Sequence, residues 1–322
     1  MAEVSAFGTA NGGKLVEAIT LRRGNLTARV LTWGAVLQGL WLEGVAHSLT
    51  LGSDQLADYE GAMRHHGAII GPVANRISGA AAEIGGRTCR FDANQDGRIC
   101  LHSGWAGTHR QVWEVAAADQ ASVTLAIHLA DGVGGFPGNC RITARYALSN
   151  DALLLTIQAQ TDALTPMNVA HHGYWNLDGS PTWAGHRMRV AADHYLPVTT
   201  DFTPDGTVAE VSGAMDFRQD RTIAPGDPSL DHNFCLSRAR GTLRDVLWLM
   251  GRGGLTLTLA TTEPGVQVYD GRDAIRPLRS RYEGLALEPQ FWPDALSHPD
   301  FPSVLLAPGQ AWQQQTRWRF SR

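Results

Sequence analysis

Hydrophobic and β-branched residues alternate with polar residues, or run together, in short stretches along most of the chain. The clearest stretches are 26–32, 123–129, 141–148, 153–160, 255–261 and 267–269. A period of two residues is typical of a strand with one buried face. Helical periodicity is scarce, and we expect one helical turn at 56–59. The pattern therefore predicts an all-β protein built from antiparallel sheets.

Turn-forming dipeptides separate these stretches. They are Asn11-Gly12, Asp96-Gly97, Asp131-Gly132, Asp178-Gly179, Asp205-Gly206 and Asp270-Gly271. The segment Ser149-Asn150-Asp151 predicts a hairpin between two long strands. No Ser- or Pro-rich linker, charge run or fixed-period repeat divides the chain. We therefore expect residues 1–322 to form a single β-sandwich domain.

Composition and charge narrow the classes of protein. The chain has 322 residues, 43% of them hydrophobic, which is enough for a substantial core. The net charge of -4 is spread without blocks, so we expect neither nucleic acid nor a membrane as a partner.

The N-terminal segment has no basic and apolar leader, and no apolar stretch is long enough to span a membrane. These features predict a cytoplasmic protein. The four cysteines form no C-x-x-C and are expected to be small buried hydrophobes.

Glu288 is the first candidate for chemistry. It lies between apolar residues 285–287 and the Pro- and aromatic-rich segment 289–293. A carboxylate in such a setting is partly desolvated, and desolvation makes it a candidate general base. The alternative is a structural glutamate at a strand end that pairs with an arginine.

The segment 168–177 is the second candidate. Its sequence, NVAHHGYWNL, places two imidazoles, a phenol, an indole and two amides within ten residues. Such density of polar and aromatic groups favours a site for a polar ligand. Three other stretches have a structural interpretation when each is taken alone: Asn75-Arg76 after an apolar segment, His102 at a strand-to-loop junction, and Asp231 after a Pro- and Gly-rich loop.

The histidines raise the question of a metal. Adjacent His65-His66 and His171-His172 point to opposite faces if they lie on strands, so neither pair can chelate one ion from a single strand. No H-E-x-x-H motif or carboxylate-rich loop is present. Phosphate-binding glycine motifs are also missing. We expect neither a catalytic metal nor a cofactor.

Taken in order, these segments resemble the aldose 1-epimerase (galactose mutarotase) family along nearly the entire chain. The resemblance is carried by 51–52 with Tyr59, 67–71, Ala-Asn-Arg-Ile at 74–77, Leu101-His102, 112–114, 131–132, 136–138, 168–177, 231–234, 263–267, Glu288 with Gln290, Pro-Asp-Ala at 293–295, Phe-Pro at 301–302, and 306–309 before a closing strand at 316–320. It implies the galactose-mutarotase-like β-sandwich, or supersandwich, whose concave face holds a sugar.

The same resemblance implies roles for individual residues. Glu288 becomes the general base and His172 the general acid. The implied sugar-binding residues are Asn75, Arg76, His102, Gly173, Tyr174, Asp231 and Gln267. The chain departs from the family pattern at Pro72, His171, Gly173 and Trp175, and three of these flank the acid, so the resemblance does not fix which sugar is bound.

The resemblance thus predicts an isomerase that interconverts the α and β anomers of a free monosaccharide, an aldohexose or aldopentose. A monomer or a homodimer is expected. Rival interpretations are a non-catalytic carbohydrate-binding or sensing protein of the same fold, a relative acting on a hexose phosphate, and a lyase or hydrolase on longer glycans. No arginine and lysine cluster lies near the motifs, which disfavours the phosphate, and no helical domain is added, which disfavours the glycan enzymes.

Overall fold

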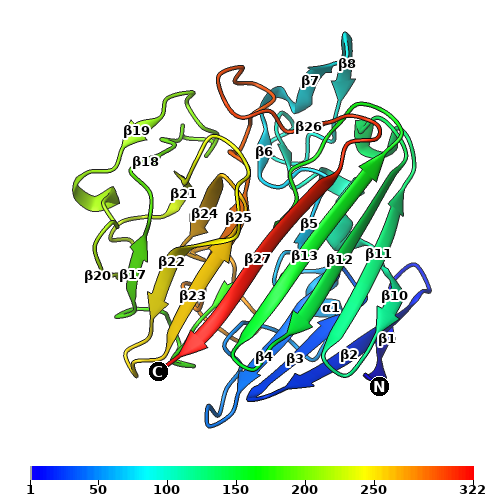
Figure 1. The fold of residues 1–322 in the computed structure, drawn as a ribbon. Helices are drawn as coiled ribbons and strands as arrows, with labels where there is room; N and C mark the ends of the chain where they lie inside the picture. Colours follow the sequence, from blue (N-terminus) through cyan, green and yellow to red (C-terminus); the bar gives the residue numbers. More distant parts are fainter. Residues whose placement is uncertain (1) are drawn as a thin grey trace.

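The chain folds into stacked antiparallel sheets, as Figure 1 shows for the computed structural model, which describes residues 2–322. The largest sheet has nine strands in the order β10-β11-β12-β13-β27-β23-β22-β17-β20. Their bounds are β10 Glu114–Ala118, β11 Ser122–Leu129, β12 Cys140–Leu148, β13 Ala152–Thr161, β27 Trp312–Ser321, β23 Thr256–Thr261, β22 Arg244–Met250, β17 Arg187–Val190 and β20 Arg221–Thr222.

Two further sheets complete most of the fold. A six-stranded sheet has the order β16 Tyr174–Trp175, β25 Leu285–Gln290, β24 Gly265–Tyr269, β21 Asp231–Cys235, β18 His194–Tyr195 and β19 Ala209–Glu210. A four-stranded sheet consists of β1 Glu3–Thr9, β2 Leu15–Arg23, β3 Leu26–Leu31 and β4 Leu37–Leu42. In Figure 1, β24 and β25 lie behind the long strands β22, β23 and β27.

Short strand pairs and turns connect these sheets. The pairs are β5 Ile69–Ile70 with β15 Ala170–His171, β6 Arg76–Ile77 with β9 Cys100–Leu101, β7 Ala81–Ile84 with β8 Arg87–Arg90, and β14 Thr165–Pro166 with β26 Leu305–Leu306. The helical elements are α1 Leu56–Glu60 and the 3-10 turns η1 Ser78–Ala80, η2 Gly104–Ala106, η3 Thr108–Arg110, η4 Val133–Gly135 and η5 Gly213–Met215.

The main hydrophobic core lies between the sheets. It joins residues of all three larger sheets, such as Leu40 on β4, Leu287 on β25 and Trp318 on β27. On β25 the apolar Leu285 and Leu287 belong to this core, and the alternate residue Glu288 is directed away from it. This alternation explains how one strand both anchors the fold and presents a carboxylate.

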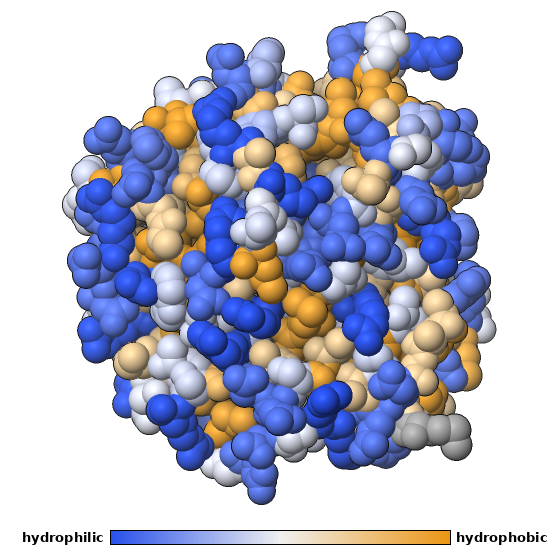
Figure 2. All heavy atoms as spheres, in the orientation of Figure 1, coloured by the Kyte–Doolittle hydropathy of each residue, from blue (hydrophilic) through white to orange (hydrophobic). Residues whose placement is uncertain are grey.

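The six stretches expected from the sequence are confirmed as strands, four of them longer than expected and two, at 26–31 and 256–261, one residue shorter. The 149–151 segment joins β12 and β13 as an antiparallel hairpin, and the single helical turn is α1. All four cysteines are free, and Cys89 differs from the prediction because it is only partly buried. Within residues 2–322, no helix is both long and apolar enough to span a bilayer. Figure 2 shows hydrophilic and hydrophobic residues interspersed on one face of the molecule.

Candidate active site

Glu288 lies on β25, the second strand of the six-stranded sheet. Its strand β25 is flanked by β16 and β24, and all six residues of β25 are buried. Glu288 is 2% exposed, and its Oε2 has no hydrogen-bond partner among the described residues. An unpartnered buried carboxylate oxygen is costly. It is therefore a position where a ligand that donates a hydrogen bond would be stabilised.

His172 faces this carboxylate. Its Nε2 lies 3.4 Å from Oε1 of Glu288. The backbone of His172 is fixed on both sides, since its N–H donates to the carbonyl of Ala68 over 2.9 Å and its carbonyl accepts from Gly67 over 2.9 Å. Its ring stacks on Tyr174 at a centroid distance of 5.1 Å. The imidazole is thus held in one orientation against the carboxylate.

Burial acts on the two groups in opposite directions. It raises the pKa of Glu288 well above its usual value and lowers the pKa of His172 to about 4. In the pocket without a ligand, a proton shared by the pair therefore resides on the carboxyl group of Glu288 rather than on the imidazole of His172. Hydrogen bonds from a ligand to the carboxylate would favour its ionised form and return the proton to the imidazole.

Asn75 and His102 hold each other in place. The N–H of His102 donates to the carbonyl of Asn75 over 2.8 Å, and the N–H of Asn75 donates to Nδ1 of His102 over 3.1 Å. Nδ1 therefore acts as an acceptor, and a neutral His102 carries its proton on Nε2. Both residues have left-handed backbone conformations, with φ values of 63° and 53°. This arrangement leaves the Nε2 proton of His102 free to bind a ligand oxygen.

The ion pair of Arg76 and Asp231 forms another wall, and Gln267 supports it from outside the cavity. Arg76 Nη1 lies 3.6 Å from Asp231 Oδ2, and Gln267 donates to Asp231 Oδ1 over 2.7 Å. Burial is the main reason that the pKa of Asp231 is raised, and Arg76 opposes this shift. Arg76 also donates to Gln95 Oε1 over 3.0 Å and to the carbonyl of Phe202 over 3.3 Å. These contacts fix the guanidinium at the edge of the site.

A cavity of about 260 Å³ joins these groups. Six of the residues expected from the sequence line it together with Glu288: Asn75, Arg76, His102, His172, Tyr174 and Asp231. Its volume lies below the range of about 300–1,000 Å³ typical of pockets for drug-sized molecules. Donors, acceptors and aromatic rings in one small cavity suit a small polyhydroxylated ligand.

Two of the predicted residues do not line this cavity. Gln267 is 3% exposed and acts through Asp231. Gly173 lies next to the ring of His171, and a Cβ atom at position 173 would stand 2.5 Å from Cε1 of that ring. The His171 ring itself packs on Trp318 at 4.8 Å, on the core side. Gly173 therefore has a packing role in this structure, and it is coupled to His171.

The cavity also contains residues that the sequence analysis did not assign to it. Arg64, His65 and Arg272 line the wall with Arg76. The expectation that no arginine cluster lies near the motifs is wrong for the folded chain. Arg272 forms a two-point ion pair with Asp270, whereas Arg64 is exposed. Because Arg64 and Arg272 come from loops far apart in the sequence, no local pattern indicates that they meet.

Comparison of the fold with solved structures defines the class of protein. An aldose epimerase homologue from C. elegans matches with a TM-score of 0.87 and 26% identity, covering 95% of this chain and 98% of the other. A galactose 1-epimerase from Lactobacillus acidophilus matches with a TM-score of 0.87 and 25% identity, covering 100% of this chain and 98% of the other. The protein is therefore a galactose-mutarotase-like β-sandwich protein.

Sequence comparison identifies the family. The model of the aldose 1-epimerase family matches residues 17–319. Galactose mutarotase of Mus musculus is 32% identical, covering 97% of this chain and 96% of its own length. Aldose 1-epimerase of Escherichia coli is 31% identical, covering 96% of each. The chain belongs to the aldose 1-epimerase family, whose members are isomerases.

Proposed function

We propose that this protein interconverts the α and β anomers of a free aldose, with Glu288 as general base and His172 as general acid. The observation that carries this proposal is the 3.4 Å approach of His172 Nε2 to Glu288 Oε1 at the base of a small polar cavity. A paired imidazole and carboxylate supply the two proton transfers that opening of a sugar ring requires.

The geometry of the substrate explains why the two groups are close. In a cyclic aldose the anomeric hydroxyl and the ring oxygen are bonded to the same carbon, C1. Glu288 takes the hydroxyl proton, the bond from C1 to the ring oxygen breaks, and its electron pair accepts a proton from His172. The product is an aldehyde. Rotation about the bond between C1 and C2, followed by the reverse transfers, closes the ring to the opposite anomer.

The remaining cavity residues position the sugar. His102 offers its Nε2 proton, and Asn75 and Arg76 offer further donors. Asp231 accepts hydrogen bonds from sugar hydroxyls, with Gln267 holding it in place. Fixed donors and acceptors hold the reacting atoms in line with the acid and base, which contributes to the rate by positioning and electrostatics. We propose that Tyr174, which lines the cavity and stacks on His172, helps to shape the sugar site. The sequence-based proposal of a sugar contact at Gly173 lacks support from the cavity lining.

The substrate class that fits best is a neutral monosaccharide. Arg76 and Arg272 are each paired with an aspartate, so their charges are already balanced within the protein. Arg64 is the cation that favours the rival hexose phosphate, because it lines the same cavity. A sugar phosphate therefore has to be included in the test.

The test is a panel of pure, freshly dissolved anomers of hexoses and pentoses, with glucose 6-phosphate beside them. Polarimetry or proton NMR follows the approach to anomeric equilibrium with and without protein. We expect the free sugars to equilibrate faster with protein. Faster equilibration of glucose 6-phosphate than of every free sugar would replace the neutral substrate with the phosphate. No acceleration for any sugar, with tight sugar binding, would favour the non-catalytic binding protein.

We also propose that residues 1–322 act as one domain, since the largest hydrophobic cluster joins residues from Ile19 to Phe320. A cytoplasmic monomer or homodimer remains our prediction from the sequence. Sedimentation of the purified chain tests the oligomeric state.

A further inference from the structure

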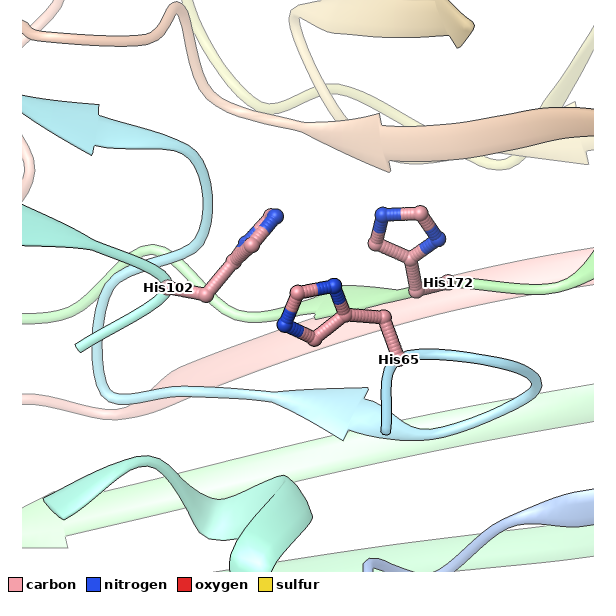
Figure 3. Close-up of side chains that lie close together, drawn as sticks. All are labelled: His65, His102 and His172. Carbon is pink, nitrogen blue, oxygen red and sulfur yellow. The ribbon is translucent and has the colours of Figure 1, made fainter. Parts of the chain in front are cut away.

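Three imidazoles meet in the wall of the cavity from three separate segments of the chain. His65 lies in the loop before β5, His102 follows β9 and His172 follows β15. One ring nitrogen from each lies within 4.8 Å of the other two. Figure 3 shows the three rings converging on a common space. The proposed mechanism uses His172 as the acid and His102 as a hydrogen-bond donor to the sugar, and leaves His65 without a role.

The rings are placed as a ligand set. The centroid of His65 lies 4.6 Å from that of His102 and 5.6 Å from that of His172, and the rings of His102 and His172 are 5.3 Å apart. His102 and His172 are buried and His65 is partly buried. Burial lowers the pKa of all three, so they are neutral at neutral pH. Neutral imidazole is a preferred ligand for zinc, copper and nickel ions.

A carboxyl group adjoins the three rings, and a bound cation would favour its ionised form. Glu288 Oε1 lies 3.4 Å from Nε2 of His172, and Oε2 of the same carboxylate has no partner among the described residues. A divalent cation beside His172 would be attracted to this carboxylate. Three nitrogens with one adjacent oxygen resemble the donor set of four-coordinate zinc.

We propose that a divalent first-row transition cation, with Zn²⁺ as the probe, binds between His65, His102 and His172. A cation there occupies the lone pair of the His172 ring nitrogen and the space in which a sugar would lie. It therefore inhibits the enzyme in competition with the sugar. The inhibition rests on the proposed function, whereas binding of the cation does not.

The hydrogen bond from the Asn75 N–H to His102 Nδ1 limits the affinity of the three histidines for a cation. This bond favours the tautomer with the proton on Nε2, the nitrogen that faces the cavity. A cation bound to Nε2 has to displace that proton and gives up the hydrogen bond, because Nδ1 then becomes protonated. His65 and His172 are consequently the stronger ligands. The site binds cations reversibly and more weakly than a dedicated structural zinc site.

His65 is the residue that tests this inference. Changing His102 or His172 alters the proposed catalytic groups, so it would not separate metal binding from turnover. The His65→Asn variant removes one ligand and retains a polar side chain. The matched control is His128→Asn, since His128 is exposed on β11, away from the cavity.

The experiment uses the full chain without an affinity tag, first freed of metal with EDTA. Calorimetry measures Zn²⁺ binding with and without a saturating sugar, and polarimetry measures the rate of each variant relative to its own metal-free rate. A protein-free blank corrects for the effect of Zn²⁺ on the sugar. Co²⁺ absorption of the unaltered protein reports the number and geometry of nitrogen ligands, so that the inference does not depend on any variant remaining folded.

We expect one Zn²⁺ per chain, weaker binding in the presence of sugar, and inhibition that EDTA reverses. His65→Asn should weaken both binding and inhibition by about tenfold or more, a loss typical of perturbing a metal site, while His128→Asn leaves both unchanged. Turnover without any Zn²⁺ binding would overturn the inference and leave the proposed function intact. Binding that His65→Asn does not weaken, or a Co²⁺ spectrum without nitrogen ligands, would also overturn it. Binding that depends on His65 in a protein without turnover would support the cation site and reject the proposed function.

Discussion

Gln267 lies directly opposite Glu288 across strands β24 and β25, and its side-chain amide donates to Asp231 Oδ1 over 2.7 Å. Residues opposite each other in an antiparallel pair place their side chains on the same face of the sheet. One glutamine therefore links the proposed base to Asp231, the proposed sugar-binding carboxylate on the third strand, β21. The spacing between the two carboxylates is set by the pairing of the strands.

Changing Gln267 to Glu should weaken sugar binding. The new carboxylate would lie against Asp231 in a buried setting, and the lost hydrogen bond and added repulsion should lower kcat/KM by about tenfold or more. Most of the effect should appear in KM, because Gln267 does not touch the reacting atoms. Gln158→Glu, at an exposed position on β13, is the control. A normal KM in a folded Gln267→Glu protein would show that Asp231 does not depend on this contact.

Changing Glu288 to Gln should lower the rate of anomer equilibration by about 10²-fold or more, because the variant retains the shape of the side chain and loses the proton acceptor. His172→Asn should have a comparable effect. Sugar binding should persist in Glu288→Gln, since Arg76 and Asp231 remain. The control is Glu114→Gln at an exposed position on β10.

The double variant extends this prediction. If Glu288 and His172 act on one substrate in one step, the double variant should be much less impaired than the product of the two single losses. Polarimetry of the four proteins at matched concentrations measures the coupling. Independent, multiplicative losses, or a nearly normal rate in folded Glu288→Gln, would reject the assignment of base and acid.

The tautomer of His102 can be observed directly. Because Nδ1 accepts the N–H of Asn75, we expect the metal-free protein to carry the His102 proton on Nε2 at neutral pH. Nitrogen-15 NMR of histidine-labelled protein distinguishes the two ring nitrogens, and a His102→Gln variant assigns the signals. A proton found on Nδ1 would mean that His102 cannot donate to a sugar in the manner proposed.

His171 and Gly173 should behave as a coupled pair. Gly173→Ser should lower the free energy of unfolding, because its Cβ would approach the His171 ring to 2.5 Å. His171→Asn shortens that side chain and should relieve the contact, so that Gly173→Ser is better tolerated in the His171→Asn background. Thermal unfolding of the two single variants and the double variant measures the interaction. Equal effects of Gly173→Ser in both backgrounds would contradict the proposed packing role.

Treatment with EDTA should leave the rate unchanged. Both proton transfers come from side chains, and no step calls for a Lewis acid. The measurement is the rate before and after dialysis against the chelator. Loss of activity that one particular metal restores would instead make the three histidines a catalytic metal site.

The sequence predicted the longer strands β11, β12 and β13 well, because a half-buried strand leaves a period of two that does not depend on its neighbours. It also indicated the buried setting of Glu288, since the apolar residues before it and the rigid segment after it are local features. The role of Glu288 as a base came from the family resemblance and stays a prediction. The prediction that the side chains of His171 and His172 point to opposite faces is confirmed, because the His171 ring packs on Trp318 while His172 faces Glu288.

The sequence did not predict the contacts between segments that are far apart in the chain. The argument about adjacent histidines considered each pair on its own strand, and it missed that His65 joins two imidazoles from other loops. Arg64 and Arg272 reach the cavity in the same way. Such contacts depend on how the sheets stack and on which loops border the cavity. The spacing of residues within one segment of the sequence indicates neither.

The left-handed backbone of several cavity residues restricts how the pocket can be altered. Asn75, His102 and Phe202 have φ values of 63°, 53° and 61°, a region that asparagine and histidine tolerate better than most residues. A library randomised at these positions would consist mainly of members with strained loops. In the described part of the chain, Arg64 has neither this constraint nor a buried ion pair, so substitutions there should alter the rim of the cavity without straining the backbone, whereas changing Arg272 would leave the buried Asp270 without its partner.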